Sequence, residues 1–373
     1  MELLLTDEQK MIRDSAATLL ERTAGPKRAR ALRGEAHGFD RARWGEIAGA
    51  GWLSLLVPGA AGGLGLGHTE LCLVAEEAGK KLLGDPLAPA AAAALALADG
   101  DWAARAELLP GLLAGAAIVV PAFQEGPLGP DPAATTVKAR RDKAGLKLRG
   151  AKGYIAGAAV ADGFLVPARS PEGTVLAYVP KDAKGATLAV ADTVDGCGVG
   201  TLTLTNVAVP ERHVVAGANR APAVIARAAD AAVLATGAEL LGVMEQAFAI
   251  ALDYIKTRVQ FGRPIGAFQV LQHRAVNQYV EVEMMRSLLY QVTGAIDSGR
   301  GSAALAAAVK ARASTAALEV TKSAIQLHGA IGFTDEHDVG LYLRRAMALA
   351  SLWGTAAHSR ARFAALAAEA VEE

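Results

Sequence analysis

The stretch DYIKTRVQFGRPIGAFQVLQHR, residues 253–274, decides how the last third of the chain folds. Arg258 lies where a helical pattern stops, and two glycines and a proline follow within a few residues, as in a tight turn. Gln269 then opens a new helical pattern. The stretch therefore predicts two helices joined by a short glycine-containing turn beside an arginine.

A second stretch with the same character is QLHGAIGFTDEHDVGLYLRRA, residues 326–346. Gly329 and Gly332 predict a break, and Thr334 followed by acidic residues predicts the N-cap of another helix. A glycine-rich break lets the backbone approach a ligand closely, and a nearby guanidinium can pair with phosphate. Each stretch taken alone is equally compatible with a simple helix–helix turn.

The hydrophobic period divides the chain into three parts. Residues 1–117 show helical patterns separated by Gly/Pro breaks, which predict an N-terminal all-α domain. Residues 118–215 show period-two alternation, clearest in TLTLTNVAVP, which predicts a small β domain. In residues 216–373 a spacing of four residues marks one face of a long helix and predicts a helix bundle; the residues are Val276, Val280, Met284 and Leu288.

Composition excludes several classes of protein. The chain has 373 residues with 38 basic and 38 acidic side chains, a balance that argues against a nucleic-acid binder. Its two cysteines lack metal-ligand spacing, so we expect no zinc site, no disulfide framework and a reduced cytoplasmic location. The start predicts a helix capped by Thr6 and Gln9 rather than a signal peptide. The most apolar run of the chain, residues 89–99, is too short for a membrane span and predicts a buried helix.

Other motifs give weaker signals. GGLGLGHTE, residues 62–70, has the glycines of a dinucleotide fingerprint but no strand before it, so a turn between helices is favoured. TDEHD, residues 334–338, is better explained as a helix start than as a metal cluster. The histidines lack a serine or cysteine in a recognisable nucleophile setting, so we expect no catalytic triad and no metal.

Together the two long stretches resemble the acyl-CoA dehydrogenase family, and the resemblance covers essentially the whole chain. The patterns YxxxRxQFGxPIGxFQxxQH and QxHGxxGFTxEHxxxLYxRRA carry it. It implies an α+β fold with an N-terminal α-helical domain, a small middle β-barrel or sandwich domain and a C-terminal four-helix bundle. It also implies a tetramer that holds FAD, oxidises an acyl-CoA thioester to its trans-2-enoyl-CoA and passes electrons to an electron-transfer flavoprotein.

Within the family, FQVLQHR and QLHGAIG look closest to the small subunit of pimeloyl-CoA dehydrogenase. They also resemble the β-type subunits of heteromeric steroid and bile-acid acyl-CoA dehydrogenases, which lack the base. The resemblance therefore implies lipid or steroid catabolism and a heterotetramer.

The family's catalytic base is a glutamate directly before a Gly-Thr pair, and Trp353 occupies that position here. An indole only donates hydrogen bonds and cannot accept the substrate proton. Some relatives carry the carboxylate on an earlier helix, at a position that aligns with Ala232. Asp230 is the alternative base, although two residues along a helix turn it to another face than position 232. We expect the Trp353 ring to fill the space of the acyl thioester.

The resemblance assigns the cofactor-binding residues unevenly. The half of the site that serves the FAD of a neighbouring subunit keeps nearly all of the family's usual residues. The half in the β domain does not. Tyr154 and Ala156 stand where a Trp and a flavin-bonding Thr are usual, and QEGPLGPD, residues 124–131, replaces the usual flavin loop. The residues expected to bind FAD are Arg258, Phe261, Gln269, Gln326, Leu327, Gly329 and Thr355.

These features favour a subunit without the base, active with a paralogous acyl-CoA dehydrogenase subunit that carries the catalytic Glu. One alternative is a self-sufficient homomeric flavoenzyme with a relocated base. Another is a non-enzymatic structural or regulatory paralogue without flavin. The acyl group, whether fatty, dicarboxylic or steroid, depends on the shape of a cavity.

Overall fold

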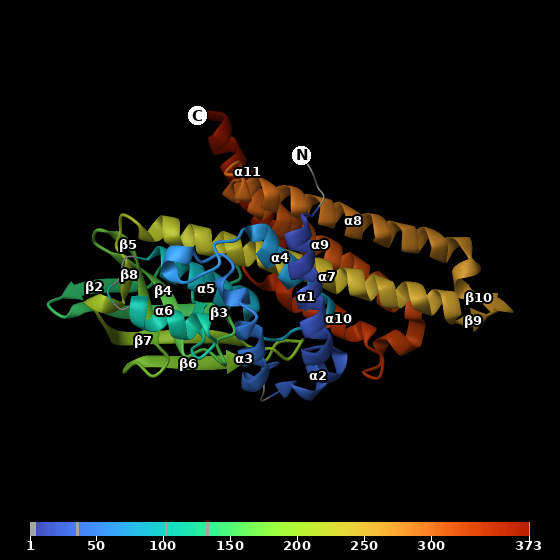
Figure 1. Cartoon of the computed structure of the whole chain (residues 1–373), viewed down its shortest axis with the longest axis horizontal. Coiled ribbons are helices and arrows are strands. Elements are labelled where there is room, and N and C mark those ends of the chain that lie inside the picture. Colours follow the sequence, from blue (N-terminus) through green and yellow to red (C-terminus); the bar gives the residue numbers. More distant parts are fainter. Residues whose placement is uncertain (1–4, 35–36, 101–102, 104, 132–133, 373) are drawn as a thin grey trace.

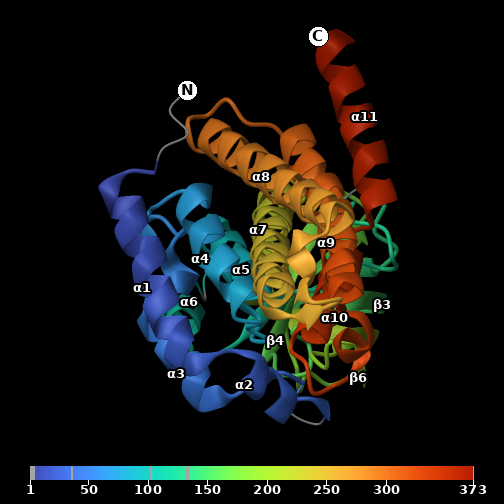
Figure 2. The same cartoon turned by 90° about the vertical axis from the view of Figure 1, so that its right-hand side faces the viewer.

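The computed structural model describes residues 5–34, 37–100, 103, 105–131 and 134–372. In Figure 1 the strands gather at one end of the molecule, and long helices run from them to the β9–β10 hairpin (Val259–Gln260 and Arg263–Pro264). Figure 2 looks from the hairpin end and shows the N-terminal helices beside α7 (Ala221–Thr257). The predicted order of a helical, a β and a second helical part is confirmed.

The N-terminal part is helical. Its first helix begins as predicted, since the Thr6 hydroxyl accepts a hydrogen bond from the Gln9 amide and the Gln9 side chain accepts one from the Thr6 amide. The elements are α1 (Asp7–Thr23), α2 (Pro26–Ala31), α3 (Arg41–Gly49), the 3₁₀ turns η2 (Trp52–Ser54) and η3 (Gly59–Ala61), α4 (His68–Lys80), α5 (Leu87–Asp99) and α6 (Arg105–Leu113).

Helix α5 is rich in alanine because it is enclosed on all sides. Every residue from Leu87 to Ala98 is buried, and the small side chains let α5 lie against α7 and strand β1. The predicted buried helix is therefore confirmed. In the described part of the chain, no helix has both the length and the apolar character that crossing a membrane requires.

The middle part is one mixed sheet in the order β6-β7-β3-β2-β4-β5-β8, with β1 parallel to β4. Side chains of β7 alternate between buried and exposed, as the TLTLTNVAVP pattern predicts. The strands are β1 (Val119–Pro121), β2 (Lys138–Asp142), β3 (Gly145–Ala156), β4 (Gly163–Ser170), β5 (Gly173–Pro180), β6 (Ala186–Ala191), β7 (Val199–Pro210) and β8 (Val214–Ala216), with the 3₁₀ turn η4 (Glu211–His213) before β8.

Of the two predicted domain limits, one lies in a connection between elements and the other lies within a strand. The limit at 117/118 falls in the connection between α6 and β1, whereas the limit at 215/216 falls inside β8. Helix α7 starts five residues after β8 and packs against α4 and α5, against strand β5 and against α9, so it joins all three parts. The division into three independent domains stays a prediction.

The C-terminal part is a bundle built around α7. Its elements are α7, the hairpin β9–β10, η5 (Ile265–Ala267), α8 (Gln269–Asp297), α9 (Ala303–His328), η6 (Gly329–Phe333), α10 (Val339–Ser351) and α11 (Ala356–Glu372). Glycines bring α4 and α7 together: a Cβ at Gly242 would lie 1.9 Å from the Glu76 carbonyl oxygen, and one at Gly79 2.1 Å from the Glu239 carbonyl oxygen. This contact fixes the position of Glu239.

The predicted apolar face of the long helix lies on α8, but it faces solvent in this chain. Val276, Val280 and Met284 have exposed fractions of 57%, 44% and 55%. Tyr279 adds a further half-exposed ring to this helix. We call Val276, Tyr279, Val280 and Met284 the α8 apolar face.

The predicted helix start at Thr334 is wrong. The Thr334 amide and hydroxyl both donate to the Ile331 carbonyl oxygen, so Thr334 closes the 3₁₀ turn η6 instead of capping a helix. Helix α10 begins five residues later, at Val339, and Asp338 precedes it without a side-chain cap. Arg30 and Arg33 of the N-terminal part hold this segment through Asp338 and Asp335, contacts that local sequence does not reveal.

Candidate active site

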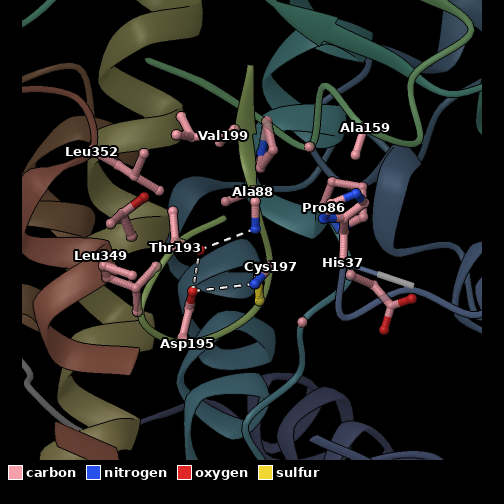
Figure 3. Close-up of a pocket in the computed structure, with 18 of the residues that line it drawn as sticks. His37, Pro86, Ala88, Ala159, Thr193, Asp195, Cys197, Val199, Leu349 and Leu352 are labelled. Atoms are coloured by element: carbon pink, nitrogen blue, oxygen red, sulfur yellow. Dashed lines mark hydrogen bonds between the residues drawn. The ribbon is translucent and has the colours of Figure 1, made fainter. Parts of the chain in front are cut away.

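An enclosed cavity of about 220 Å³ lies where the sheet meets the helices. Figure 3 shows Leu349 and Leu352 on one side, His37, Pro86 and Ala159 on the other, and the loop with Thr193 and Cys197 between them. Most of the lining is apolar, and the charged side chains that line the cavity come from three different parts of the chain. They are Asp85, Asp195, Glu239 and Arg345.

The turn after α10 forms one end of this cavity. Trp353, which lines the cavity, is 5% exposed, and its amide donates a 2.9 Å hydrogen bond to Gln124 Oε1. Its φ of +58° lies in the left-handed region, and Gly354 follows with φ +98°. The loop after Gln124 packs on this turn, because a Cβ at Gly129 would lie 2.9 Å from the Trp353 carbonyl oxygen.

Arg345 organises the polar side of the cavity. Its guanidinium donates to Glu239 Oε1 at 2.7 and 2.5 Å, to Asp195 Oδ2 at 2.7 Å and to the Leu83 carbonyl oxygen at 3.1 Å. Burial raises the pKa of Glu239 in spite of this arginine. Burial acts on Asp195 in the same direction, but Arg345 and hydrogen bonds outweigh it and lower the pKa of Asp195. Both carboxyls are therefore committed to Arg345.

Asp85 is a cavity residue that sequence reasoning missed. It is 3% exposed and forms an ion pair with Arg28 at 2.9 Å. Burial raises its pKa to about 6, although Arg28 opposes this shift. Its only sequence signal is the Gly-Asp-Pro tripeptide just before α5, which reads as an ordinary helix start.

The opposite end of α7 carries the predicted neighbour-facing residues. Arg258 ends α7, Phe261 is 90% exposed at the tip of the hairpin, and Gln269 is the first residue of α8. Tyr254 on α7 stacks on His328 at the end of α9, with ring centroids 4.4 Å apart. This stack holds the end of α7, just before the hairpin, against the end of α9.

That segment is the end of α9 and the start of η6. Gln326 and Gly329 are exposed there, whereas the Leu327 side chain is buried in the bundle, so Leu327 offers only its backbone to a ligand. Thr355 lies apart from this group. It follows the Trp353 turn, which contacts Gln124 in the loop after β1 and not the hairpin segment.

Comparisons with known proteins bear on this arrangement. Residues 6–116 match the family model of the acyl-CoA dehydrogenase N-terminal domain, and residues 223–367 match that of the C-terminal domain. Acyl-CoA dehydrogenase IpdE2 of Mycolicibacterium smegmatis is 30% identical over 94% of this chain and 96% of its own length. This chain belongs to the acyl-CoA dehydrogenase family.

Solved structures show the same fold. A variant of the Tcur3481-Tcur3483 steroid ACAD is 33% identical, covers 98% of this chain and 99% of its own, and has a TM-score of 0.89. The ChsE4-ChsE5 complex from Mycobacterium tuberculosis contains a chain that is 25% identical, with 99% of both chains covered and a TM-score of 0.86. The predicted acyl-CoA dehydrogenase-like fold is therefore confirmed.

Neither expected position of the family's base carries a carboxylate. Trp353 and the buried Ala232 occupy them. Asp230, the alternative base, is not among the residues that line the cavity, and it accepts a 3.0 Å hydrogen bond from Arg362 on α11. Burial raises its pKa, with Arg362 opposing. The structure thus places Asp230 on a different face of α7 from the cavity.

Two features stand in the part of the β domain where the family resemblance predicts the other half of the flavin site. Ala156, which lines the cavity, presents a methyl group where a hydroxyl donor is expected. The loop after Gln124 is fixed from within: Lys152, wholly buried, donates to Glu125 Oε1 at 2.5 Å and to Thr135 Oγ1 at 2.6 Å. Burial acts to raise the pKa of Glu125, but these hydrogen bonds lower it to about 2.

Proposed function

We propose that this chain is the subunit of a heteromeric acyl-CoA dehydrogenase that lacks the general base and completes the FAD site of a partner subunit. The observation that carries the proposal is Trp353 in the cavity wall at the position of the base. The partner would be a paralogous subunit with the glutamate in place, and the complex would desaturate an acyl-CoA thioester.

The charges in the cavity support the absence of a base. Asp85 pairs with Arg28, and both Asp195 and Glu239 pair with Arg345. Arginine N–H groups already occupy oxygens of these carboxylates that would have to accept a proton from carbon, although burial raises the pKa of Asp85 and of Glu239. The cavity is also smaller than the roughly 300–1,000 Å³ that ligand sites usually have. A relocated base in a homomeric enzyme therefore has little support.

The hairpin end supports a role in binding FAD. Among the described residues, the side chains of Arg258, Gln269 and Gln326 have no intramolecular partner, and all three are exposed. Gly329, at φ +66°, has no atom within 4 Å of the place of a Cβ, so its backbone is open to a ligand. The donors suit a pyrophosphate, and the Phe261 ring suits a flat heterocycle. The residues present thus fit FAD.

When bound, FAD supplies the acceptor for the hydride that leaves the acyl chain. This chain's own residues would bind and orient it: Arg258 supplies a fixed positive charge, while the Gln269 and Gln326 amides supply hydrogen bonds. Thr355 follows the Trp353–Gly354 turn at the cavity. We therefore expect it to contribute little to the FAD site formed by Arg258, Gln269 and Gln326.

The partner itself needs a surface, and the α8 apolar face offers one. Exposed apolar area of this kind marks contacts between chains. The names of two similar proteins, a steroid ACAD and a two-component complex, favour a heteromer that acts on a steroid acyl-CoA. Electrons would then pass to an electron-transfer flavoprotein, as the family resemblance implies.

Activity of the purified chain, with and without a Glu-bearing paralogue from the same source, tests the proposal. We expect the isolated chain to leave added flavin oxidised when acyl-CoA is present, because loss of a general base costs about 10²–10⁴-fold in rate. The co-expressed pair should co-purify, be yellow and reduce its flavin. Turnover by the isolated chain at rates ordinary for enzymes would refute the proposal.

A further inference from the structure

Three arginines of one short segment connect distant parts of the chain. They lie in α2 and just after it, at positions 28, 30 and 33. Arg28 pairs with Asp85 at 2.9 Å, and the buried Asp85 lines the cavity just before α5 begins. Loss of one partner of a buried ion pair is strongly destabilising. The pair therefore fixes α2 on the buried part of the N-terminal domain, beside the cavity.

The other two arginines bind the segment between η6 and α10. Arg33 donates two hydrogen bonds to the Asp335 carboxylate, from Nη1 to Oδ2 at 3.2 Å and from Nη2 to Oδ1 at 2.9 Å. Arg30 donates to Asp338 Oδ1 at 2.5 Å and to the Asp335 carbonyl oxygen at 3.1 Å. Two-point contacts from a planar guanidinium fix orientation as well as distance. Residues 335–338 are therefore held in a defined position relative to α2.

The same segment is also tied to the end of α9. The ring of His337 lies 4.4 Å from the ring of His328, measured between centroids, and His328 is the last residue of α9. His337 Nδ1 accepts a hydrogen bond of 3.2 Å from the Val339 amide at the start of α10. Residues 329–336 therefore form a loop whose flanking residues, His328 and His337, are in contact.

This loop carries groups that are open to a ligand. Gly329 is exposed and has no atom within 4 Å of the place of a Cβ, and the Phe333 side chain is 79% exposed. Gly332, by contrast, packs closely on α9, since a Cβ there would lie 2.9 Å from the Ile325 carbonyl oxygen. The loop thus folds back on α9 and leaves Gly329 and Phe333 at the surface.

We propose that Arg30 and Arg33 are positioning residues for the FAD site at the hairpin end. They fix residues 335–338, and these in turn fix the loop that presents the Gly329 backbone. Carboxylates of the segment engage both guanidinium groups, so the arginines act through the loop and not on FAD itself. This inference rests on the proposed function, in which Gly329 and Gln326 bind the FAD of a partner subunit. It makes α2, in the N-terminal part, a support of that site.

The exposure of these ion pairs indicates where their loss should be felt. The side chains of Asp335 and Asp338 are 57% and 44% exposed. The hydrogen bonds from Arg33 hold the pKa of Asp335 below its usual range, so its carboxylate is charged at neutral pH. Exposed ion pairs contribute little to the free energy of unfolding. Their removal should therefore loosen the loop while the rest of the chain stays folded.

FAD titration of the complex, co-expressed with its Glu-bearing partner, tests the proposal. The double variant Arg30→Gln/Arg33→Gln should raise the Kd for FAD about 2–30-fold, the usual range for residues that act through a packed network. Turnover at saturating FAD should change less than this Kd. Arg33→Lys keeps the charge but not the two-point contact, so its Kd should lie between those of the parent complex and of Arg33→Gln.

The matched control removes two arginine ion pairs that stay within the N-terminal helices. Arg13 pairs with Asp14 on α1, and Arg43 pairs with Glu46 on α3. Neither pair reaches the C-terminal part. The double variant Arg13→Gln/Arg43→Gln should therefore bind FAD as the parent complex does.

Hydrogen exchange of the isolated full-length chain tests the loop without FAD and without a partner. The amides of Thr334, Val339 and Leu341 all donate hydrogen bonds within residues 331–341. In the Arg30→Gln/Arg33→Gln chain these amides should lose protection, whereas amides of α4 and α5 should keep the protection of the parent chain.

Two more variants keep the test decisive. Asp335→Asn changes one half-exposed side chain, so it serves if the double arginine variant folds poorly, and it should shift both measurements in the same direction. Arg258→Ala separates this inference from the proposed function. If Arg258→Ala weakens FAD binding while the double variant and Asp335→Asn do not, the inference is overturned and the proposed function stands. Full FAD affinity in Arg258→Ala would refute both, and unchanged protection of residues 334–341 would overturn the inference alone.

Discussion

Replacement of Arg258 by alanine separates a partner-facing role in FAD binding from a structural one. Arg258 caps the end of α7 with extended backbone angles, φ −70° and ψ 116°, which alanine also adopts. Its amide donates to the Tyr254 carbonyl oxygen, and its own carbonyl accepts from the Ile265 amide, both at 2.8 Å. These backbone contacts survive the substitution, so the hairpin should keep its shape.

The loss on binding follows from the chemistry of the guanidinium. A hydrogen bond to a charged group contributes about 1.5–3 kcal/mol. At 1.4 kcal/mol per decade, Arg258→Ala should weaken FAD binding by the complex about 10–150-fold. The free energy of unfolding of the isolated chain should hardly change, because the Arg258 side chain has no partner among the described residues.

The assay is FAD titration of the co-expressed complex after flavin removal, together with flavin content as purified and dehydrogenase activity. Arg140→Ala, an exposed arginine on strand β2, is the matched control for loss of charge. Tyr154→Phe and Trp353→Phe should change FAD affinity far less than Arg258→Ala. Full flavin occupancy in Arg258→Ala, with flavin loss in the Tyr154 or Trp353 variants, would refute the reasoning.

Three further predictions concern packing and electrostatics within the chain. Gly242→Ala should lower the free energy of unfolding by about 1–3 kcal/mol, since the new Cβ would meet the Glu76 carbonyl. Gly294→Ala on α8 is the control: there is open space around its Cβ position, so this variant should be as stable as the parent chain or more stable. Chemical denaturation measures both. Arg345→Met should cost about 3–5 kcal/mol by leaving Glu239 and Asp195 buried and unpaired, measurable as a lower melting temperature. Glu125, whose folded pKa is about 2 against 4.5, stabilises the fold above pH 4.5 and loses this effect as pH falls toward 2; Glu125→Gln should therefore destabilise at pH 7 and much less at pH 2.5.

Local sequence signals predicted the elements that depend on neighbouring residues. The capping box of Thr6 and Gln9, the end of α7 at Arg258 and the start of α8 at Gln269 all occur as expected. Each depends on backbone hydrogen bonds within a few residues, which the local residue types determine. The same logic failed at Thr334, where the hydroxyl satisfies a preceding carbonyl instead of a following amide.

Contacts between distant segments could not be predicted from one sequence. Asp85 meets Arg28, which lies 57 residues away, and Lys310 meets Gly354, which lies 44 residues away. The role and the pKa of a buried charged group depend on its partner. The packing of α2, α9 and α10 determines which partner that is. The family resemblance predicts that Trp353 replaces the base, but only the fold shows that the carboxyls of the cavity are held by arginines.

The exposure of the two ends of the molecule explains why a partner is the simplest account. At the cavity end, several polar groups pair within the chain: Gln124 accepts from Trp353, and Lys152 donates to Glu125. At the hairpin end, Phe261 is 90% exposed and Phe333 79% exposed beside polar side chains that have no partner among the described residues. Exposure of an aromatic ring to water is unfavourable, and burial of the ring against another molecule removes this unfavourable free energy. We infer that the hairpin end is completed by another molecule, whereas the cavity end depends mainly on pairs within the chain.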